Sequence, residues 1–427
     1  MARKVFISFL GTNDYVATHY QIGDAKSSLV RFVQEALIDH LCVDWGQDDR
    51  IYIFLTEDAC RKNWLNYENR IGLKEILERK KVWPLVESVK INEGISEEEI
   101  WGLFNDIYSK LNENDEVYFD ITHAFRSIPM FVTVLMNYAK FMKNISVESI
   151  LYGAFEKLGS AYEVRQLPEA DRIAPVIDLT SIVRLQNLTQ TASDVLNYGK
   201  IGTVGRTLSE SDYSPAVTNA ILQLKNTVEK LEECIILNRA RKLKSGELTA
   251  NLQTNIKRLL SEGELNKAEH EILSRLYSMI YDFGKNHQKN LEVAINWALE
   301  FDMIPQAYTL GQENIKELCL KNFTNYFEDM ETPVGKRKTI VSGVLGISER
   351  EYDRRKFDEP EIFEKLFESD LVQDLRPYYI GLKDNRNSLN HAKENYDDPS
   401  KDMFTYKEEF IRDYYNCLNI LKNAPEY

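Results

Sequence analysis

The sequence is poor in the residues that build disulfide and metal sites. It has five cysteines and six histidines among 427 residues, and no two cysteines form a Cys-x-x-Cys pair. An odd number of scattered cysteines fits neither a disulfide framework nor a zinc site, so we expect reduced thiols. The histidines at positions 19, 40, 270 and 287 are too widely spaced to form a convincing set of metal ligands. We therefore expect no bound metal and no cofactor.

A long hydrophobic run is also missing. The first residues, MARKVFISFLGTND, begin with basic residues, but the apolar run that follows is only about six residues long, too short for a signal peptide. No window approaches the roughly 20 apolar residues of a membrane-spanning helix, and even IPMFVTVLMNYAKFM is interrupted by Lys140. We therefore expect a cytoplasmic protein with no membrane partner.

Basic residues are fewer than acidic residues. Lys and Arg total 53 against 67 Asp and Glu, and the net charge is −14. Such a chain does not coat nucleic acid through bulk charge, so any contact with a phosphate backbone must be local. Two basic runs, GKRKT at 335–339 and DRRKF at 353–357, are candidates for such contacts, with solvated loops as the alternative.

The sequence shows two kinds of hydrophobic pattern, one before and one after about residue 180. Up to about residue 180, short β-branched and aromatic runs, such as KVFISFL and EVYFDIT, alternate with amphipathic segments such as SLVRFVQEALIDHL. This alternation predicts a mostly parallel sheet with covered faces. After Thr180 long helical periodicity takes over. Because one hydrophobic core rarely supports 427 residues, we predict an α/β domain over residues 1–178 and an all-α domain over 179–427.

The stretch DNRNSLNHAKEN, residues 384–395, places Arg386, Asn387 and His391 within about a turn and a half of predicted helix. An arginine can hold phosphate oxygens with two donors at once, and a histidine near its ordinary pKa can transfer a proton at neutral pH. Asn387 could orient either partner. The three residues are therefore a candidate catalytic set, and the alternative is a solvated polar helix face.

One histidine does not easily serve as both base and acid in an in-line displacement at phosphorus, because the two protons move on opposite sides. Two copies related by a two-fold axis could do so, and two-fold dimers are the commonest oligomers. No metal is needed if the substrate supplies the nucleophile, as the ribose 2′-OH of RNA does. Such a dimeric site would cut RNA and leave DNA intact.

A second candidate site lies where two predicted strands end. FISFLGTNDY places Gly11, Thr12 and Asn13 after the first strand, and VYFDITHAFRSIP places another group between a later strand and the next helix. The second group comprises Thr122, His123, Ala124, Phe125 and Arg126. Ligands of open α/β sheets bind beyond such strand ends, where glycine, free helix N–H groups and arginine suit a phosphate. The sequence predicts a site for a phosphate-bearing small molecule, with an ordinary strand-to-helix turn as the alternative.

FLGTNDY, DITHAFRSIP and RNSLNH together resemble the CRISPR-associated CARF–HEPN ribonucleases of the Csx and Csm type, accessory effectors of type III CRISPR systems. The resemblance follows the whole chain and implies a Rossmann-like CARF domain first and a helical HEPN domain last. It assigns the catalytic places to Arg386, Asn387 and His391, and the ligand-binding places to the two strand-end groups. Many relatives carry glycine where Ala124 stands, which leaves ring size and affinity open.

The family implies a homodimer whose CARF domains together bind a cyclic tetra- or hexa-adenylate as activator. The same resemblance implies that the bound ring activates a composite HEPN site for antiviral defence. This site is expected to cleave single-stranded RNA without metal and to leave 2′,3′-cyclic phosphate ends. Two alternatives remain: a CARF sensor with an inactive helical scaffold, or a ring nuclease that destroys its activator through Thr12, Asn13 or His123. Ring size, RNA sequence preference and assembly beyond the dimer stay open.

Overall fold

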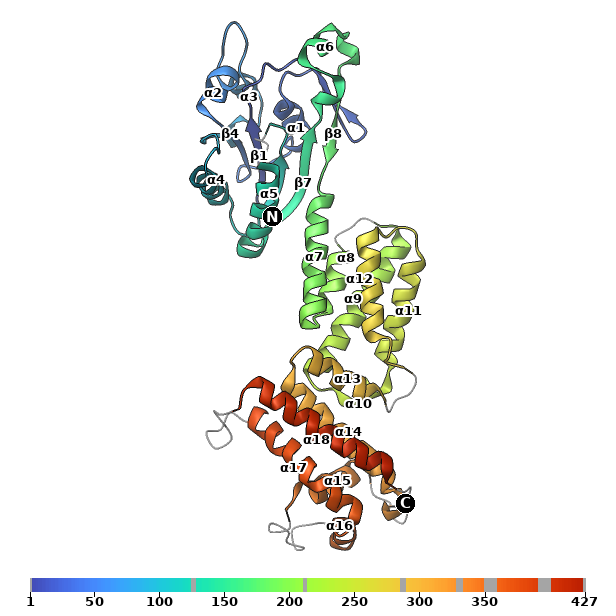
Figure 1. Ribbon diagram of the computed structural model, residues 1–427. Helices are drawn as coiled ribbons and strands as arrows, with labels where there is room; N and C mark the ends of the chain where they lie inside the picture. The colour runs from blue at the N-terminus through green and yellow to red at the C-terminus, as the bar shows by residue number, and fades with distance from the viewer. Residues whose placement is uncertain are drawn as a thin grey trace. The chain divides into compact units, whose positions relative to one another are not determined.

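The computed structural model describes residues 2–123, 128–209, 213–284, 289–327, 333–348, 359–390 and 401–424. The chain divides into two compact units, residues 1–187 and 188–427, each described here by itself (Figure 1). The predicted α/β half followed by a helical half is confirmed. The predicted domain limit falls at the end of strand β8, Ile173–Asp178, whereas the two units divide inside helix α7, Ser181–Tyr198. The extent of each domain stays a prediction.

The first unit is built on one eight-stranded sheet with the order β3-β2-β8-β7-β6-β1-β4-β5. The strands are β1 (Lys4–Leu10), β2 (His19–Ile22), β3 (Ala25–Lys26), β4 (Arg50–Leu55), β5 (Val86–Lys90), β6 (Glu116–Asp120), β7 (Ser146–Gly153) and β8 (Ile173–Asp178). β1 pairs in parallel with both β4 and β6, so the C-terminal ends of these three strands lie at one edge. Because β1 and β4 are buried on both faces, their sequences are continuous apolar runs.

Helices cover both faces of this sheet and enclose two separate hydrophobic cores (Figure 1). The helices before α7 are α1 (Val33–Leu41), α2 (Glu57–Ala59), η1 (Cys60–Trp64), α3 (Leu73–Glu78), η2 (Trp83–Leu85), α4 (Glu97–Lys110), α5 (Ile128–Lys143), η3 (Phe155–Leu158), α6 (Ala161–Gln166) and η4 (Glu169–Asp171). Phe6 faces the core under α1 and α3, whereas Ile7 faces the core under α4 and α5. Neighbouring residues of β1 thus serve opposite cores, as the two-residue period of a strand requires.

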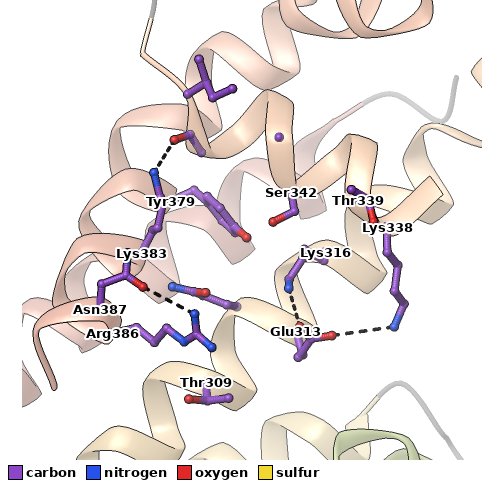
Figure 2. A pocket seen from close by; sticks show the side chains of 14 residues that line it. Thr309, Glu313, Lys316, Lys338, Thr339, Ser342, Tyr379, Lys383, Arg386 and Asn387 are labelled. Atoms are coloured by element: carbon purple, nitrogen blue, oxygen red, sulfur yellow. Dashed lines mark hydrogen bonds and ion pairs between the residues drawn. The ribbon is translucent and has the colours of Figure 1, made fainter. Parts of the chain in front are cut away.

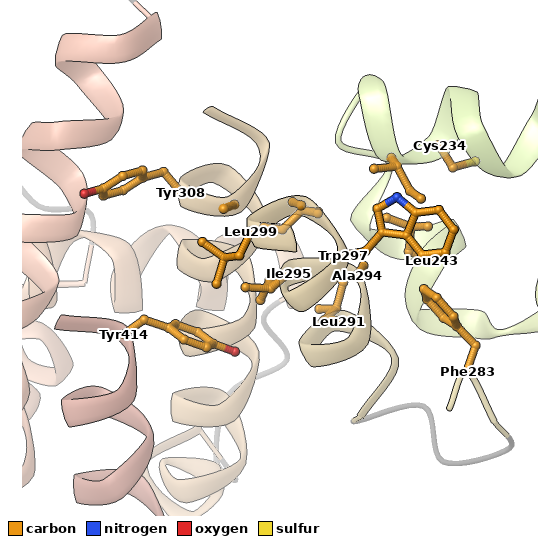
Figure 3. Close-up of a cluster of buried hydrophobic side chains, with 14 of the residues drawn as sticks. Cys234, Leu243, Phe283, Leu291, Ala294, Ile295, Trp297, Leu299, Tyr308 and Tyr414 are labelled. Carbon is orange, nitrogen blue, oxygen red and sulfur yellow. The ribbon is translucent and has the colours of Figure 1, made fainter. Parts of the chain in front are cut away.

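The described part of the second unit is helical throughout. After α7 its helices are α8 (Gly202–Leu208), α9 (Pro215–Ile236), α10 (Ala240–Ser245), α11 (Glu247–Ser261), α12 (Lys267–Ile280), α13 (Lys289–Glu300), α14 (Ile304–Asn322), η5 (Thr324–Phe327), α15 (Val334–Gly346), α16 (Pro360–Phe367), α17 (Asp370–Asn390) and α18 (Met403–Asn423). One buried cluster runs through them. Figure 3 shows α13 in its middle, with Trp297 pointing toward Leu243 and Phe283, and Leu299 on the side of Tyr308. Helix α13 therefore joins the core around α9 and α10 to the core around α14 and α18.

Helix α17, which carries Arg386, packs closely against its neighbours at glycines. A Cβ placed on Gly381 would lie 2.4 Å from Oδ2 of the buried Asp413 on α18. On α14, a Cβ placed on Gly311 would lie 2.8 Å from the ring of Phe410, also on α18. Both separations are too short for a side chain, so these glycines permit the tight packing of α14, α17 and α18.

Candidate functional site

The ends of β1 and β6 bring the two predicted strand-end segments together. Gly11 follows β1 directly, and Thr122 and His123 follow β6 after Ile121. A Cβ placed on Gly11 would lie 3.4 Å from the Cβ of His123 and 2.6 Å from the hydroxyl oxygen of Tyr15. A side chain at position 11 would therefore force its neighbours apart. Three further residues of the predicted site, Ala124, Phe125 and Arg126, lie outside the described residues.

A buried carboxylate shapes the segment after β6. Asp120 accepts hydrogen bonds from the Ser8 hydroxyl at 2.6 Å and from the backbone N–H of Thr122 at 2.9 Å. The Thr122 hydroxyl also donates to Asp120, and it accepts from the backbone N–H of Gly153 at 2.8 Å. Burial raises the pKa of Asp120, and the hydrogen bonds from Ser8 and Thr122 oppose this rise. The Thr122 side chain thus holds the turn in place.

The loop after β1 is fixed by Asn63, a residue that sequence analysis did not identify. Asn63 is 1% exposed, and its amide nitrogen donates to the backbone oxygens of Gly11 and Asn13, both at 2.9 Å. Arg31 in turn donates to the Asn63 side-chain oxygen at 2.9 Å. Thr12 and Asn13 themselves have exposed side chains. Because Asn63 lies in η1, shortly after β4, the loops that follow β1 and β4 form one structure.

Aromatic rings form the surface beside this loop. The ring centroids of Tyr15 and His123 are 4.5 Å apart, and Tyr15 meets Phe32 edge-on at 5.6 Å. Burial lowers the pKa of His123 to about 4, although part of the residue remains accessible. Burial also raises the pKa of Tyr15. Both rings are therefore neutral at physiological pH, and the surface they form is uncharged.

Arginines lie around the same loop. Arg70 and Arg165 both pair with Asp14, and the distance from Arg165 Nη2 to Asp14 Oδ2 is 2.6 Å. Burial lowers the pKa of Arg31, and the positive charge of Arg70 adds to this effect. These three guanidinium groups outnumber the two carboxylates described at this site, Asp14 and the buried Asp120, and the positive balance favours an anionic ligand at this edge of the sheet.

In the second unit, Arg386 and Asn387 line a cavity of about 570 Å³ between α14, α15 and α17 (Figure 2). Four basic residues and one acidic residue line it. They are Lys316, Lys338, Lys383 and Arg386, with Glu313. Lys338 belongs to the basic run at 335–339, whereas the run at 353–357 lies outside the described residues. The cavity is therefore a positive site in an acidic protein.

These cations differ in how far they are already paired. Lys316 and Lys338 both pair with Glu313, and Lys383 Nζ donates to the backbone oxygen of Gly346 at 2.7 Å. Arg386 makes one long contact, 3.5 Å from Nη1 to Oδ1 of Asn387, and its buried Nε has no partner within the described residues. Figure 2 shows the Arg386 side chain extending along the cavity. Most donors of this guanidinium thus remain available to a ligand.

The turn of α17 that carries Arg386 is anchored by its neighbour Asn385. The Asn385 amide nitrogen donates to the Tyr308 hydroxyl at 3.0 Å and to Glu409 Oε2 at 2.8 Å. Lys401 donates to the Asn385 oxygen at 3.0 Å and to Glu409 at 2.7 Å. Partial burial would raise the pKa of Glu409, but hydrogen bonds from Lys401 and Asn385 hold it below its ordinary value. Asn385 therefore ties α17 to α14 and α18.

His391 is the predicted acid–base residue. It lies outside the described residues, directly after Asn390, the last residue of α17. The structure thus places Arg386 and Asn387 in one cavity, and the role of His391 stays a prediction. Within the described residues, no group of three or more His, Cys, Asp or Glu is arranged to hold a metal ion, and no helix is long and apolar enough to cross a membrane. All five cysteines belong to the described residues and are free thiols.

Comparison with known proteins identifies the first unit. Residues 5–156 match the family model described as CRISPR system endoribonuclease Csx1, CARF domain. The chain carries a CARF domain. It is also 25% identical, over 471 aligned residues and 99% of its length, to the CRISPR-associated protein MJ1674 of Methanocaldococcus jannaschii. These two similarities support the CARF-containing, CRISPR-associated part of the group predicted from the motifs, and the HEPN ribonuclease half stays a prediction.

The extent of these matches differs along the chain. Both strand-end segments lie inside the CARF match, whereas the cavity at Arg386 lies beyond it. The chain spans 66% of the length of the Methanocaldococcus relative, less than two thirds. A solved structure of Enterococcus italicus Csm6 bound to cyclic hexa-2′-fluoro-hexa-dAMP aligns with 99% of this chain and 94% of that chain, at 15% identity and a TM-score of 0.46.

Proposed function

We propose that this protein is an endoribonuclease of type III CRISPR defence that a cyclic oligoadenylate switches on. The ring binds at the strand ends of the CARF domain, and single-stranded RNA is cut in the cavity that contains Arg386. The active form is a homodimer, in which two copies of Arg386, Asn387 and His391 act on one phosphodiester. The 2′-OH of the RNA is the nucleophile, so the chemistry needs no metal, and DNA is not a substrate.

The observation that carries this proposal is the cavity at Arg386. A −14 protein gathers four basic side chains around a cavity of about 570 Å³, and the predicted catalytic Arg386 and Asn387 both line it. A guanidinium with unused donors can bind two oxygens of one phosphate. Such donors, fixed where charge develops, typically accelerate a reaction by about 10²–10³-fold.

The chemistry follows from these side chains. The 2′-oxygen attacks the adjacent phosphorus and loses its proton to one His391, while the 5′-oxygen leaves and gains a proton from the other copy of His391. Arg386 stabilises the negative charge on the non-bridging oxygens. The products are a 2′,3′-cyclic phosphate and a free 5′-hydroxyl. Positioned acid and base groups each contribute about 10²–10⁴-fold.

The strand-end site supports binding of the activator. The surface formed by Tyr15 and His123 is neutral and aromatic, which suits the stacking of adenine bases. Arg31, Arg70 and Arg165 nearby suit the phosphates of the ring. Alternating bases and phosphates of a nucleotide ring thus find matching chemistry on one edge of the sheet.

An exposed apolar face on the CARF domain supports the dimer. Val134, Tyr138 and Phe141 of α5 are 61%, 45% and 64% exposed, and their spacing places them on one side of the helix. The ring centroids of Tyr138 and Phe104 of α4 are 5.5 Å apart. Trp101, whose ring contacts that of Phe104, is 58% exposed. A second copy of the chain would bury this face, and exposed apolar patches commonly mark protein–protein interfaces.

The ring-nuclease alternative receives no support from His123. A histidine whose pKa lies near 4 is a weak base at neutral pH, so His123 is poorly suited to take a proton from a ribose hydroxyl. The sensor alternative, with an inactive helical half, gives no role to Arg386, whose Nε has no partner among the residues that the structure describes.

The proposal is tested by incubating single-stranded RNA with the protein in EDTA, with cyclic tetra-adenylate, with cyclic hexa-adenylate and without a ring. We expect cleavage with one ring, 2′,3′-cyclic phosphate ends, and no cleavage by a His391→Ala variant. Degradation of the cyclic oligoadenylate without cleavage of the RNA would favour the ring nuclease. If neither molecule is degraded, the sensor is favoured.

A further inference from the structure

A second cavity of the helical unit adjoins the one at Arg386. It has a volume of about 920 Å³ and shares the lining residues Thr309, Glu313 and Lys338 with the first cavity. Because the same side chains line both, the two cavities adjoin each other, one next to α17 and the other next to α10. A flexible strand bound in the first cavity can continue into the second.

The second cavity is strongly basic. Five basic side chains and two carboxylates line it. They are Arg239, Arg241, Lys242, Lys244 and Lys338, with Glu313 and Glu317. Both carboxylates are already paired with lysines, Glu313 with Lys316 and Lys338, and Glu317 with Lys244 and Lys338. Burial alone would raise the pKa of Glu317, but hydrogen bonds from Lys244 and Lys338 hold it below its ordinary value.

Three of these cations differ from the rest. Three side chains are exposed and form no ion pair with any residue that the structure describes: Arg239, Arg241 and Lys242. They belong to α10 and the residue before it, and α10 is fixed to the core through Leu243, which is 1% exposed and lies beside Trp297 (Figure 3). A firmly anchored helix thus presents unpaired positive charge to the cavity.

We propose that the cavity lined by Arg239, Arg241 and Lys242 is a second phosphate-binding subsite, which holds the RNA backbone beside the linkage bound at Arg386. This inference rests on the proposed function, because it takes single-stranded RNA as the ligand. A protein of net charge −14 repels RNA overall, so binding depends on unpaired cations gathered next to the cleavage site. Contacts to phosphates position a strand without reading its bases. The subsite therefore favours long strands of any sequence.

The test measures binding of a long 2′-O-methylated uridine strand to the full-length protein at several salt concentrations. This strand has no 2′-hydroxyl to attack phosphorus, so it is not cleaved. For single strands, log K falls with log salt by about 0.7 per neutralised phosphate. The variant Arg239→Gln/Arg241→Gln should bind on the order of tenfold more weakly, with a slope shallower by about 1.4, because two contacts are lost.

A matched control separates the subsite from general charge. Arg258→Gln/Arg275→Gln removes the same charge from exposed positions on α11 and α12, outside the cavity, and should bind the strand like the wild type. On cleavable RNA, Arg239→Gln/Arg241→Gln should raise KM for a long strand, while KM for a trinucleotide and kcat for both stay unchanged.

Two results would overturn the subsite: both double variants weaken binding equally, or Arg239→Gln/Arg241→Gln binds the methylated strand as the wild type does. Failure of the proposed nuclease looks different. A wild-type protein that binds the strand through Arg239 and Arg241 but cleaves no RNA retains the subsite and loses the catalytic role of Arg386.

Discussion

The strand-end site of the CARF domain and the helical cavity at Arg386 use polar side chains in opposite ways. At the strand ends, Asp120, Thr122 and Asn63 are engaged in hydrogen bonds that hold two loops against each other. In the helical cavity, Arg386 keeps most of its donors unpaired among the described residues. The first site is a shaped aromatic surface with arginines around its loop, and the second is a cavity lined mainly by basic side chains. This difference agrees with the proposal that one site recognises a ligand and the other stabilises reacting charge.

The largest effect that this comparison predicts is at Arg386. Arg386→Ala should reduce the rate of RNA cleavage at saturating activator by about 10²–10³-fold, because donors to the developing charge are lost. Arg386→Lys keeps the charge without the two-donor fork and should remain impaired. Single-turnover cleavage measures the chemical step, with Arg258→Ala as an exposed control on α11. Wild-type cleavage by Arg386→Ala would show that the cavity is not the catalytic site.

At the strand ends, shape should matter more than charge. Gly11→Ala places a methyl group 2.6 Å from the Tyr15 hydroxyl, so the loop must move and affinity for the activator should fall by about 1–3 kcal/mol. Calorimetric titration of the ring measures this loss. As a control, Gly102→Ala on α4 has open space around the added methyl and should stabilise the protein by about 0.5–1 kcal/mol. Unchanged ring affinity in Gly11→Ala would place the activator elsewhere.

The hydrogen bonds of Asn385 predict a smaller effect, on stability. Asn385→Ala removes bonds to Tyr308, Glu409 and Lys401 in a buried place, so the free energy of unfolding should fall by about 1–3 kcal/mol. Denaturant unfolding measures it. Asn390→Ala, at an exposed position of the same helix with one long contact of 3.4 Å, should change stability little. Equal stability of the two variants would mean that Asn385 does not anchor α17.

The smallest expected effect is the pH dependence contributed by His123. Its folded pKa of about 4 lies below the ordinary value of 6.5, so in this window the unfolded chain binds a proton that the folded chain does not. His123 therefore contributes stability above pH 6.5 that is lost as the pH falls toward 4. An NMR titration of the imidazole should show a midpoint near 4. A midpoint near 6.5 would show that the ring is not buried against Tyr15 in solution.

Much of the fold could be predicted from the sequence, because its causes are local. The continuous apolar runs of β1 and β4 reflect burial on both faces, and Gly11 and Thr122 each follow a strand that the pattern already located. The side-by-side position of the two segments follows from parallel pairing of β1 and β6. These features depend on strand period and sheet geometry, which short stretches of sequence record.

The partners of these residues could not be predicted, because they depend on long-range contacts. Asn63 is 52 positions from Gly11, and Asn385 is 77 positions from Tyr308. An asparagine in CRKNW or DNRNS carries no pattern that names such a partner. Asp120 was visible as an acidic residue within VYFDIT, but its bond to Ser8 appears only when β1 and β6 pair. Position in the fold, and not residue type, gives these side chains their roles.

The most direct test of the account follows RNA cleavage while the cyclic oligoadenylate is titrated into the wild type, Gly11→Ala and Arg386→Ala. We expect Gly11→Ala to need a higher concentration of the ring to reach the wild-type plateau of cleavage. Arg386→Ala should bind the ring with wild-type affinity and never reach that plateau. Cleavage of RNA that ignores the ring, or a full plateau in Arg386→Ala, would contradict the separation of sensing and cutting between the two sites.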